Sequence, residues 1–473
     1  MRARREGPDV DLSRWRRRLP GADAPRCRNG DRTNPQRSNS KIEQEAGHDP
    51  VAFTPHGRRL RRRTHSCARG LLLRRRRAQQ PAAKTELKLY NDKGAWSKYF
   101  DEMGTLSKQQ IGLSMKPVGY TDEPTYQAFI KASFRTDVKP DLFTWTTGGR
   151  LSEIVAQKQV AETTPLWQEA IKNGDLTAEL AKYYTVGGKQ YCVPLNAAYW
   201  GMFYNKKIFD QHGLKPPTTW DELMGIAATL KKSGVTAFYH TSVLFSFVWF
   251  EQLLAGTDPD LYDRLSTGQA KYTDPGVVEV MKRWKSMVDA GYFNNPGDKT
   301  DPGDVLKTGK AAMVSFGTWF NTSMTQRDMK AGTDYGFFTI PNVNPALPKT
   351  SMIFESGPLC SLAKAPDAQA STKYLKWWVT PAAQEKWATA RGDVSANPKV
   401  AMADEAIAQV GKAASGGEYR LVNRYFEAAP PPVLTAALDG FGAFVVKPDG
   451  YQKILEDIQR VADEYWSTHP QGG

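Results

Sequence analysis

The 473-residue chain has few residues of the kinds that bind metals. After residue 84 it retains only Cys192 and Cys360 and the histidines His212, His240 and His469. No histidine has a second metal ligand at a helical or turn spacing, and two cysteines do not make a zinc site. The sequence therefore predicts no metal and no cofactor. The two cysteines can pair if the protein is exported, or they can remain buried thiols.

The motifs of common enzyme classes are also missing. There is no G-x-S-x-G, no P-loop and no G-x-G-x-x-G after a strand, and DGFGAF at 439–444 lacks the third glycine. Composition does not exclude the paired carboxylates of a glycosidase, but nothing in the chain singles out such a pair. These absences favour a binding protein over an enzyme.

Most of the chain has no excess of positive or negative charge. The formal net charge is +14, yet residues 1–84 hold 23 basic and 8 acidic residues, which leaves 41 basic and 42 acidic residues for 85–473. A nucleic-acid binder needs a basic surface, so that function would require residues 1–84 to be a natural part of the protein. We predict no nucleic-acid partner.

Apolar runs are short in the Arg-rich segment 1–84. Its longest is Leu71–Leu73, whereas a secretory signal needs about 7–15 apolar residues. Cys67 also lacks the small apolar residues that precede a lipoprotein cysteine. We expect this segment to be disordered. We also hypothesise that part of it is not the natural leader, because a GC-rich gene read in the wrong frame or from the wrong start yields such sequence. The sequence of this segment therefore does not show whether the mature protein carries a lipid anchor.

What is present is an alternation of short strands and amphipathic helices. Strands are predicted at 85–90, 112–118, 140–145 and 236–240. A helix is predicted at 218–235, where Thr219 and Glu222 form a capping box, and another begins at Pro275. This rhythm predicts an α/β protein with parallel sheets covered by helices on both faces. No run approaches the 18 or more apolar residues of a membrane helix.

Aromatic residues gather where predicted strands end. In open α/β sheets ligands bind beyond the carboxyl ends of strands, and a flat ring there can stack on the C–H face of a sugar. Burial in the core is the alternative for any single ring. The aromatic residues at such positions are Trp145, Tyr199, Trp200, Phe245, Trp249 and Trp319.

Five blocks of sequence agree in type and order with a known family. Together they resemble the family 1 extracellular solute-binding proteins of bacterial ABC importers, the class of maltose-binding protein. The blocks are 140–166, 188–223, 306–323, 335–342 and 390–400, where 188–223, 335–342 and 390–400 resemble the three interdomain crossings.

The resemblance implies the type II periplasmic-binding-protein fold, an α/β fold of two lobes with a ligand cleft between them. Lobe one is expected at 85–195 plus 342–395 and lobe two at 196–341 plus 396–473. Hinge bending would close the lobes around a saccharide, and a membrane permease would read the closure. It further implies an exported monomer, at the cell surface or in the periplasm.

Ligand-binding residues follow from matching positions. Asn91, Asp92 and Lys93 form a polar turn after the first strand, where relatives bind sugar hydroxyls. Trp145 and Trp319 match pocket tryptophans. Thr146 and Thr147 stand where relatives place charged sugar ligands, which suggests a saccharide other than maltose. The remaining predicted ligand-binding residues are Tyr120, Tyr199, Trp200, Phe245, Trp249, Glu355, Tyr425, Glu427 and Phe441.

Three other functions remain open from the sequence. A protein of the same fold can bind a polyamine or a phosphate ester, and Glu355 and Asp92 leave a cationic ligand open. A glycan-degrading enzyme would turn over oligosaccharide. A nucleic-acid binder would lose its salt-dependent DNA affinity on deletion of residues 1–84.

Overall fold

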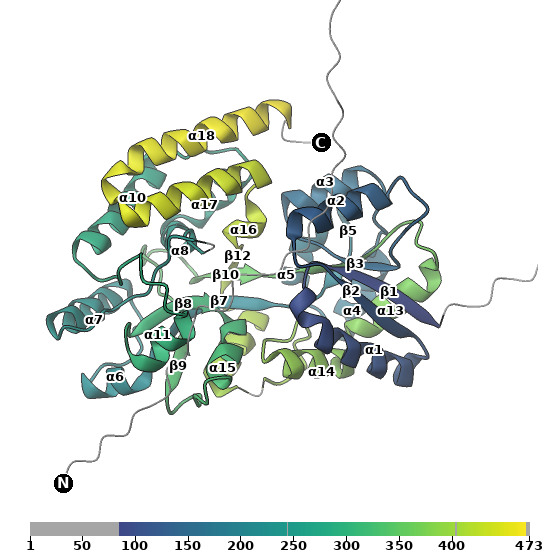
Figure 1. The fold of residues 1–473 in the computed structure, drawn as a ribbon, viewed down its shortest axis with the longest axis horizontal. Coiled ribbons are helices and arrows are strands. Elements are labelled where there is room, and N and C mark those ends of the chain that lie inside the picture. The colour runs from purple at the N-terminus through teal and green to yellow at the C-terminus, as the bar shows by residue number, and fades with distance from the viewer. Residues whose placement is uncertain (1–84, 244, 403, 470–473) are drawn as a thin grey trace, which may run out of the picture. The chain divides into compact units, whose positions relative to one another are not determined.

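The computed structural model describes residues 85–243, 245–402 and 404–469 (Figure 1). All of them belong to one compact unit, residues 79–473. The Arg-rich segment 1–84 lies outside the described residues, so its disorder stays a prediction. The described residues form two five-stranded sheets with helices around them.

The first sheet has the strand order β2-β1-β3-β11-β6. β1 pairs in parallel with β2 and β3, whereas β11 is antiparallel to β3 and β6. Leu87 and Leu89 alternate with more exposed residues along β1 and are fully buried, so both lie on the same face of the sheet. The strands are β1 Glu86–Asn91, β2 Ser114–Gly119, β3 Leu142–Thr144, β6 Val193–Pro194 and β11 Pro358–Ser361.

Helices cover both faces of the first sheet. In Figure 1, α2 and α3 lie above its strands, and α1 and α14 lie below them. Local signals set the helix ends: the Asp122 side chain caps α2 through the Thr125 N–H, and Gly112 ends α1 in the left-handed conformation. The elements are η2 Gly94–Trp96, α1 Ser97–Ile111, α2 Glu123–Ser133, α3 Gly149–Ala156, α4 Thr164–Asn173, α5 Ala178–Ala181, η3 Lys182–Tyr184, α13 Ala368–Trp378 and α14 Pro381–Arg391, with a hairpin of β4 Thr185–Val186 and β5 Lys189–Gln190.

The second sheet is built around β7. The strand order is β12-β10-β7-β8, and β9 also pairs with β7. β7 is antiparallel to β8, β9 and β10, and only β10 and β12 pair in parallel. The strands are β7 Ala198–Asn205, β8 Met313–Gly317, β9 Tyr335–Phe338, β10 Ser351–Glu355 and β12 Arg420–Asn423.

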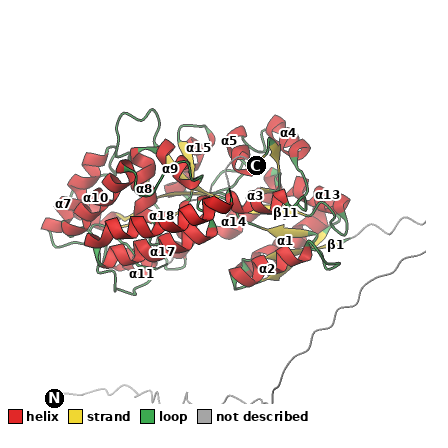
Figure 2. Ribbon diagram, turned by 90° about the horizontal axis from the view of Figure 1, so that it is seen from above, coloured by secondary structure: helices red, strands yellow, loops and turns green. Residues whose placement is uncertain are grey.

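Helices also enclose the second sheet. In Figure 1, α8, α10, α17 and α18 lie above it and α6, α11 and α15 below it, and α17 and α18 pack side by side in both views (Figure 1, Figure 2). The predicted capping box of Thr219 and Glu222 is confirmed at the start of α7, and α10 begins at Pro275 as predicted. The helices are α6 Lys206–Gln211, α7 Trp220–Lys232, α8 Val248–Thr257, α9 Pro259–Ser266, α10 Pro275–Asp289, α11 Pro302–Thr308, η4 Thr318–Phe320, α12 Asn321–Thr325, α15 Glu405–Ser415, α16 Tyr425–Ala428, α17 Pro431–Val446, η5 Pro448–Gly450 and α18 Tyr451–Thr468.

Two structural predictions were wrong. Neither five-stranded sheet is purely parallel, because β7 and β11 are the strands with which the chain enters one sheet from the other, and both run antiparallel to their neighbours. The predicted strand 236–240 forms only isolated bridges, in which Phe238 pairs with both Phe293 and Met313. Because Phe238 alone pairs with both segments, no run of successive residue pairs forms, and a strand needs such a run.

The chain passes between the sheets at places that differ partly from the prediction. β6 ends at Pro194 in the first sheet and β7 begins at Ala198 in the second, close to the predicted passage at 195. However, 335–342 is not a passage, because β9 and β10 both pair with β7. The chain returns to the first sheet only between Glu355 and Pro358, so β10 lies outside the lobe to which we assigned it.

A disulfide joins Cys192 to Cys360 within the first sheet. Both side chains are fully buried, and the neighbouring residues Val193 and Leu359 pair across β6 and β11. The bond closes a long loop that contains the first of the two chain segments forming the second sheet, the segment with β7 to β10. Of the two alternatives left open by the sequence, the structure has the paired form. Among the described residues, no helix is both long and apolar enough to cross a membrane.

Candidate functional site

The end of β10 carries a carboxylate that collects three donors. Glu355 Oε2 accepts hydrogen bonds from Trp200 Nε1 at 3.0 Å, from Trp319 Nε1 at 2.9 Å and from Arg424 Nη1 at 2.9 Å. Trp200 lies on β7, which pairs with β10, and Trp319 lies in the 3-10 turn after β8. Within the described residues no side chain or backbone group binds Glu355 Oε1, which is left free to accept a hydrogen bond from a ligand.

Arg424 links this carboxylate to a second one. It follows β12, and its guanidinium also donates to both carboxylate oxygens of Glu427, from Nε at 2.7 Å and from Nη2. Burial lowers the pKa of Arg424, but the charges of Glu355 and Glu427 outweigh burial and raise it above its usual value. Burial raises the pKa of Glu427, and the charge of Arg424 opposes that change.

Aromatic rings surround the Glu355 network. The Trp200 and Trp319 rings lie 5.8 Å apart edge-on, and the Phe245 ring lies 5.7 Å from Trp200 and 6.0 Å from Trp319. Trp200 is buried, whereas Trp319 and Phe245 are half-buried. Two rings of the predicted set therefore present partly open surface beside a carboxylate oxygen.

A polar turn of the first sheet contributes a second charged pair. Asp92 follows β1 and accepts hydrogen bonds from Thr144 Oγ1 at 2.7 Å and Lys93 Nζ at 2.6 Å. Burial by itself would raise the pKa of Asp92, but Lys93 and Thr144 lower it by more, so the pKa lies below its usual value. Burial lowers the pKa of Lys93, but Asp92 and, from the second sheet, Glu355 raise it on balance. Asn91 is buried and shapes this turn by accepting from the Lys93 N–H at 3.0 Å.

The two sheets also contact each other through the loop after β3. The Thr147 hydroxyl lies 3.4 Å from Asn423 Oδ1, at the end of β12. A Cβ on Gly148, which has a φ of +69°, would stand 2.5 Å from the Glu427 carbonyl oxygen, so only glycine fits this contact. Thr147 is buried here and Thr146 beside it is half-buried.

Several predicted residues lie away from this assembly. Trp145 is 4% exposed and donates its indole N–H to the Arg150 carbonyl. Tyr120 packs on Tyr126 and Phe129, and Tyr199 packs on Phe354 beneath the site.

Three more predicted residues belong to the core around the second sheet. Trp249 packs on Phe238 and Phe293, and Phe441 packs on Phe250. Tyr425 is buried, with its hydroxyl 2.6 Å from that of Tyr272. An aromatic residue near a strand end can turn toward the cleft or the core, and the pattern does not distinguish the two.

Sequence reasoning missed Arg424, Trp96 and Arg391. The Arg391 guanidinium carbon lies 3.7 Å from the Trp96 ring centroid, and Lys93 Nζ lies 5.7 Å from the same ring. The spacing of Arg424 and Glu427, three residues apart, was a readable signal of an ion pair. Nothing local signals Arg391, which lies 295 positions after Trp96.

A buried carboxyl in the segment after α14, that of Asp393, binds Thr318, the residue before Trp319. Thr318 Oγ1 donates to Asp393 Oδ1 at 2.8 Å, and the Val394 N–H donates to the same oxygen at 2.8 Å. The Tyr199 N–H in turn donates to Thr318 Oγ1 at 3.3 Å. Burial raises the pKa of Asp393 to about 7, although the bonds from Thr318 and Val394 lower it.

This carboxyl predicts a pH dependence of stability. Because the folded pKa of Asp393 lies above its unfolded value, its contribution to stability is present at low pH and is lost as pH rises from about 4 to 7. Asp393→Asn should remove that loss. The free energy of unfolding of the variant minus that of wild type should therefore be about 2–4 kcal/mol larger at pH 8 than at pH 4. Denaturant unfolding at several pH values measures this. Parallel pH profiles for the two proteins would contradict it.

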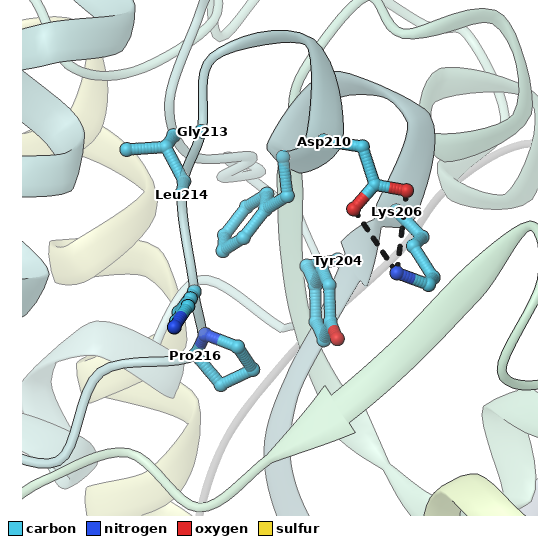
Figure 3. A pocket seen from close by; sticks show the side chains of 8 residues that line it. Tyr204, Lys206, Asp210, Gly213, Leu214 and Pro216 are labelled. Carbon is cyan, nitrogen blue, oxygen red and sulfur yellow. Dashed lines mark hydrogen bonds and ion pairs between the residues drawn. The ribbon is translucent and has the colours of Figure 1, made fainter.

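A surface hollow lies elsewhere, beside the second sheet (Figure 3). It has a volume of about 400 Å³ and is lined by Tyr204, Phe209, Leu214 and Pro216 among others. Of its three charged groups, Lys206 and Asp210 pair with each other at 3.0 Å, and the third is Lys215. It therefore lacks the converging buried donors and acceptors found around Glu355. Among the described residues, no cluster of three His, Cys, Asp or Glu side chains can hold a metal ion.

Residues 103–414 match the model of a protein family described as bacterial extracellular solute-binding protein. The chain belongs to this family. It is therefore a solute-binding protein and not an enzyme, as the sequence predicted. The match includes Trp145, Trp200, Trp319, Glu355 and Arg391.

Curated relatives of this solute-binding protein carry transport-related names. An uncharacterized ABC transporter extracellular-binding protein of Pyrococcus horikoshii is 25% identical over 54% of this chain and 58% of its own length. The multiple sugar-binding protein of Streptococcus mutans is 27% identical over 44% of this chain and 51% of its own length. The match thus spans little more than half of either relative.

Solved structures share the fold of this solute-binding protein over nearly their whole length. The solute receptor AcbH, described as exclusive for β-D-galactopyranose, superposes with a TM-score of 0.69 at 19% identity over 80% of this chain and 99% of its own. A chitin oligosaccharide binding protein gives 0.67 at 20% identity over 82% and 100%. RafE of Streptococcus pneumoniae gives 0.67 at 17% identity over 82% and 99%. The chain therefore has the two-lobe α/β fold of periplasmic binding proteins, with one lobe around each five-stranded sheet.

Proposed function

We propose that this protein captures a saccharide, a di- or oligosaccharide, between its lobes and delivers it to the permease of an ABC importer. The names of its relatives support the transport role, and several solved structures of the same fold are described as sugar receptors. The observation that carries the proposal is the Glu355 assembly. It places one free carboxylate oxygen beside two half-open aromatic rings.

Those groups suit the two kinds of surface on a sugar. Glu355 Oε1 can accept a hydrogen bond from a hydroxyl group, and three donors on Oε2 keep the carboxylate oriented. The Trp319 and Phe245 rings can cover the apolar C–H face of the ring. Asp92 and Lys93 on lobe one offer an acceptor and a donor from the other side.

The proposed mechanism is capture by hinge bending. Three passages would connect the lobes, at 194–198, at 355–358 and in the segment after α14. Glu355 lies directly at the second passage, and the Asp393 network ties Trp319 to the third. A ligand held by both lobes would favour the closed arrangement, because only that arrangement allows all contacts at once. The working protein would be an exported monomer, at the cell surface or in the periplasm.

A polyamine is the second candidate, and the charges at the site disfavour it. Asp92 is paired with Lys93, and Glu355 and Glu427 are both paired with Arg424. An ammonium group that binds the free Oε1 of Glu355 would therefore meet a carboxylate whose charge Arg424 already balances. It would also approach Arg391, for which the described residues supply no carboxylate partner.

Thermal-shift screening tests the proposal. The full chain is screened against mono-, di- and oligosaccharides, with polyamines and amino acids in the same panel. A ligand at 100 times its dissociation constant should stabilise the protein by about 2.7 kcal/mol. Shifts confined to saccharides would support the proposal. Shifts confined to polyamines or amino acids would overturn it.

Truncation of Trp319 should weaken the binding of any sugar hit. Trp319→Ala removes both a half-open ring and a donor to Glu355, so we expect a loss of about 1–3 kcal/mol in binding free energy by calorimetric titration. Trp466→Ala is the matched control, because Trp466 is a half-buried tryptophan on α18, where it packs over Gly268. Equal affinities for a folded Trp319→Ala variant and wild type would remove Trp319 from the site.

A further inference from the structure

Arg391 differs from the other sheltered arginines of the described residues. Five arginines of the described residues are buried or half-buried, and four of these five form ion pairs. The pairs are Arg150 with Glu123, Arg327 with Asp301 and Asp304, Arg420 with Asp260 and Asp263, and Arg424 with Glu355 and Glu427. Arg391 has no described carboxylate within 4.0 Å. Its positive charge is therefore without a close counter-ion among these residues.

The guanidinium of Arg391 is nevertheless firmly held. It stacks on Trp96 at 3.7 Å and lies 5.3 Å from the Tyr99 ring centroid. Trp96 itself is backed by Trp387, whose ring centroid lies 6.0 Å away. Thr322 Oγ1 donates to the Arg391 carbonyl at 2.6 Å and so fixes the backbone at the end of α14. A stacked, immobilised guanidinium is ready to bind a planar anion with two parallel hydrogen bonds.

The surroundings of Arg391 carry further positive charge. Lys93 Nζ lies 5.7 Å from the same Trp96 ring, so Trp96 is flanked by two cations, and of these only Lys93 has a carboxylate at ion-pair distance, Asp92. Burial lowers the pKa of Arg391 below its usual value, while Asp393 and, from the second sheet, Glu355 oppose that change without cancelling it. A partly desolvated charge without a close counter-ion is costly, and a ligand anion would relieve that cost.

We propose that Arg391 binds a carboxylate of the ligand, so that the captured saccharide contains a uronic acid unit. This inference rests on the proposed function and narrows its substrate class. The acidic unit would lie against the Trp96–Arg391 platform of lobe one. The hydroxyl groups of the sugar would face Glu355 and Trp319 of lobe two.

Matched sugars test this inference on the full wild-type chain. D-galacturonate, D-glucuronate and digalacturonate are titrated calorimetrically at pH 7, each against its neutral parent and against its methyl ester. At least one acid should bind about tenfold or more tightly than both neutral forms, the gain expected of a charge-assisted hydrogen bond. The methyl ester keeps the shape of the acid and removes its charge, so this comparison needs no variant.

Arg391→Gln should abolish the preference for the acid over the neutral sugar. Arg420→Gln is the matched control, since it removes a half-buried arginine charge that is already paired and lies at the start of β12. Equal or tighter binding of the neutral forms would overturn the inference and leave saccharide capture standing. Failure of every saccharide, acidic or neutral, would overturn both. Retention of the preference for the acid in Arg391→Gln would overturn the role of Arg391.

Discussion

Replacing Arg424 by methionine is expected to lower the free energy of unfolding by about 3–5 kcal/mol at pH 7. The side chain of Arg424 is 9% exposed, and its guanidinium is the ion-pair partner of both Glu355 and Glu427. Removing it leaves two sheltered carboxylates without a cation. Denaturant unfolding followed by circular dichroism measures the change.

The arginine at position 420 provides the control for this experiment. Arg420 also pairs with two carboxylates, Asp260 and Asp263, but all three side chains are a third or more exposed. Arg420→Met should therefore cost only about 0–1 kcal/mol. Adding Glu427→Gln to Arg424→Met should recover part of the loss, because it removes one of the unpaired charges. A loss below about 1 kcal/mol for Arg424→Met would contradict the buried network.

Loss of the Cys192–Cys360 bond should have the second large effect. The bond joins residues 168 positions apart, and removing a native disulfide typically costs about 2–5 kcal/mol, more for long loops. The double variant Cys192→Ala, Cys360→Ala should be destabilised by that amount. Denaturant midpoints of the variant and the oxidised wild type measure it.

Reductant supplies the control for the disulfide. Both cysteines are fully buried, so reductant reaches the bond only when the protein unfolds. Added during denaturant unfolding, it should lower the wild-type midpoint and leave that of the double variant unchanged. Equal midpoints for the variant and the oxidised wild type would show that the bond does not form in the protein.

The fold was predictable from the sequence where local signals decide it. β1 follows an alternation of apolar residues, and α7 and α10 begin at a capping box and a proline, so their positions matched. Strand direction was not predictable in the same way. β11 enters the first sheet after the chain has built most of the second, and its antiparallel pairing with β3 depends on contacts between residues more than 200 positions apart.

The site was predictable only where a residue type has few other uses. A carboxylate after an apolar strand singled out Glu355, and the polar turn singled out Asp92 and Lys93. Trp249 shares the strand-end pattern of Trp319 yet packs in the core, because burial of a large aromatic ring is favourable and the pattern does not specify which way the ring turns. Trp96 and Arg391 meet only in the folded chain, so no local spacing could reveal them.

The most direct test of saccharide capture is a crystal structure with the sugar that gives the largest thermal shift. The account predicts that the sugar lies between the two lobes, with a hydroxyl group within hydrogen-bond distance of Glu355 Oε1 and a ring face against Trp319 or Phe245. A sugar bound only outside the cleft, for example in the hollow beside Tyr204 and Pro216, would contradict it.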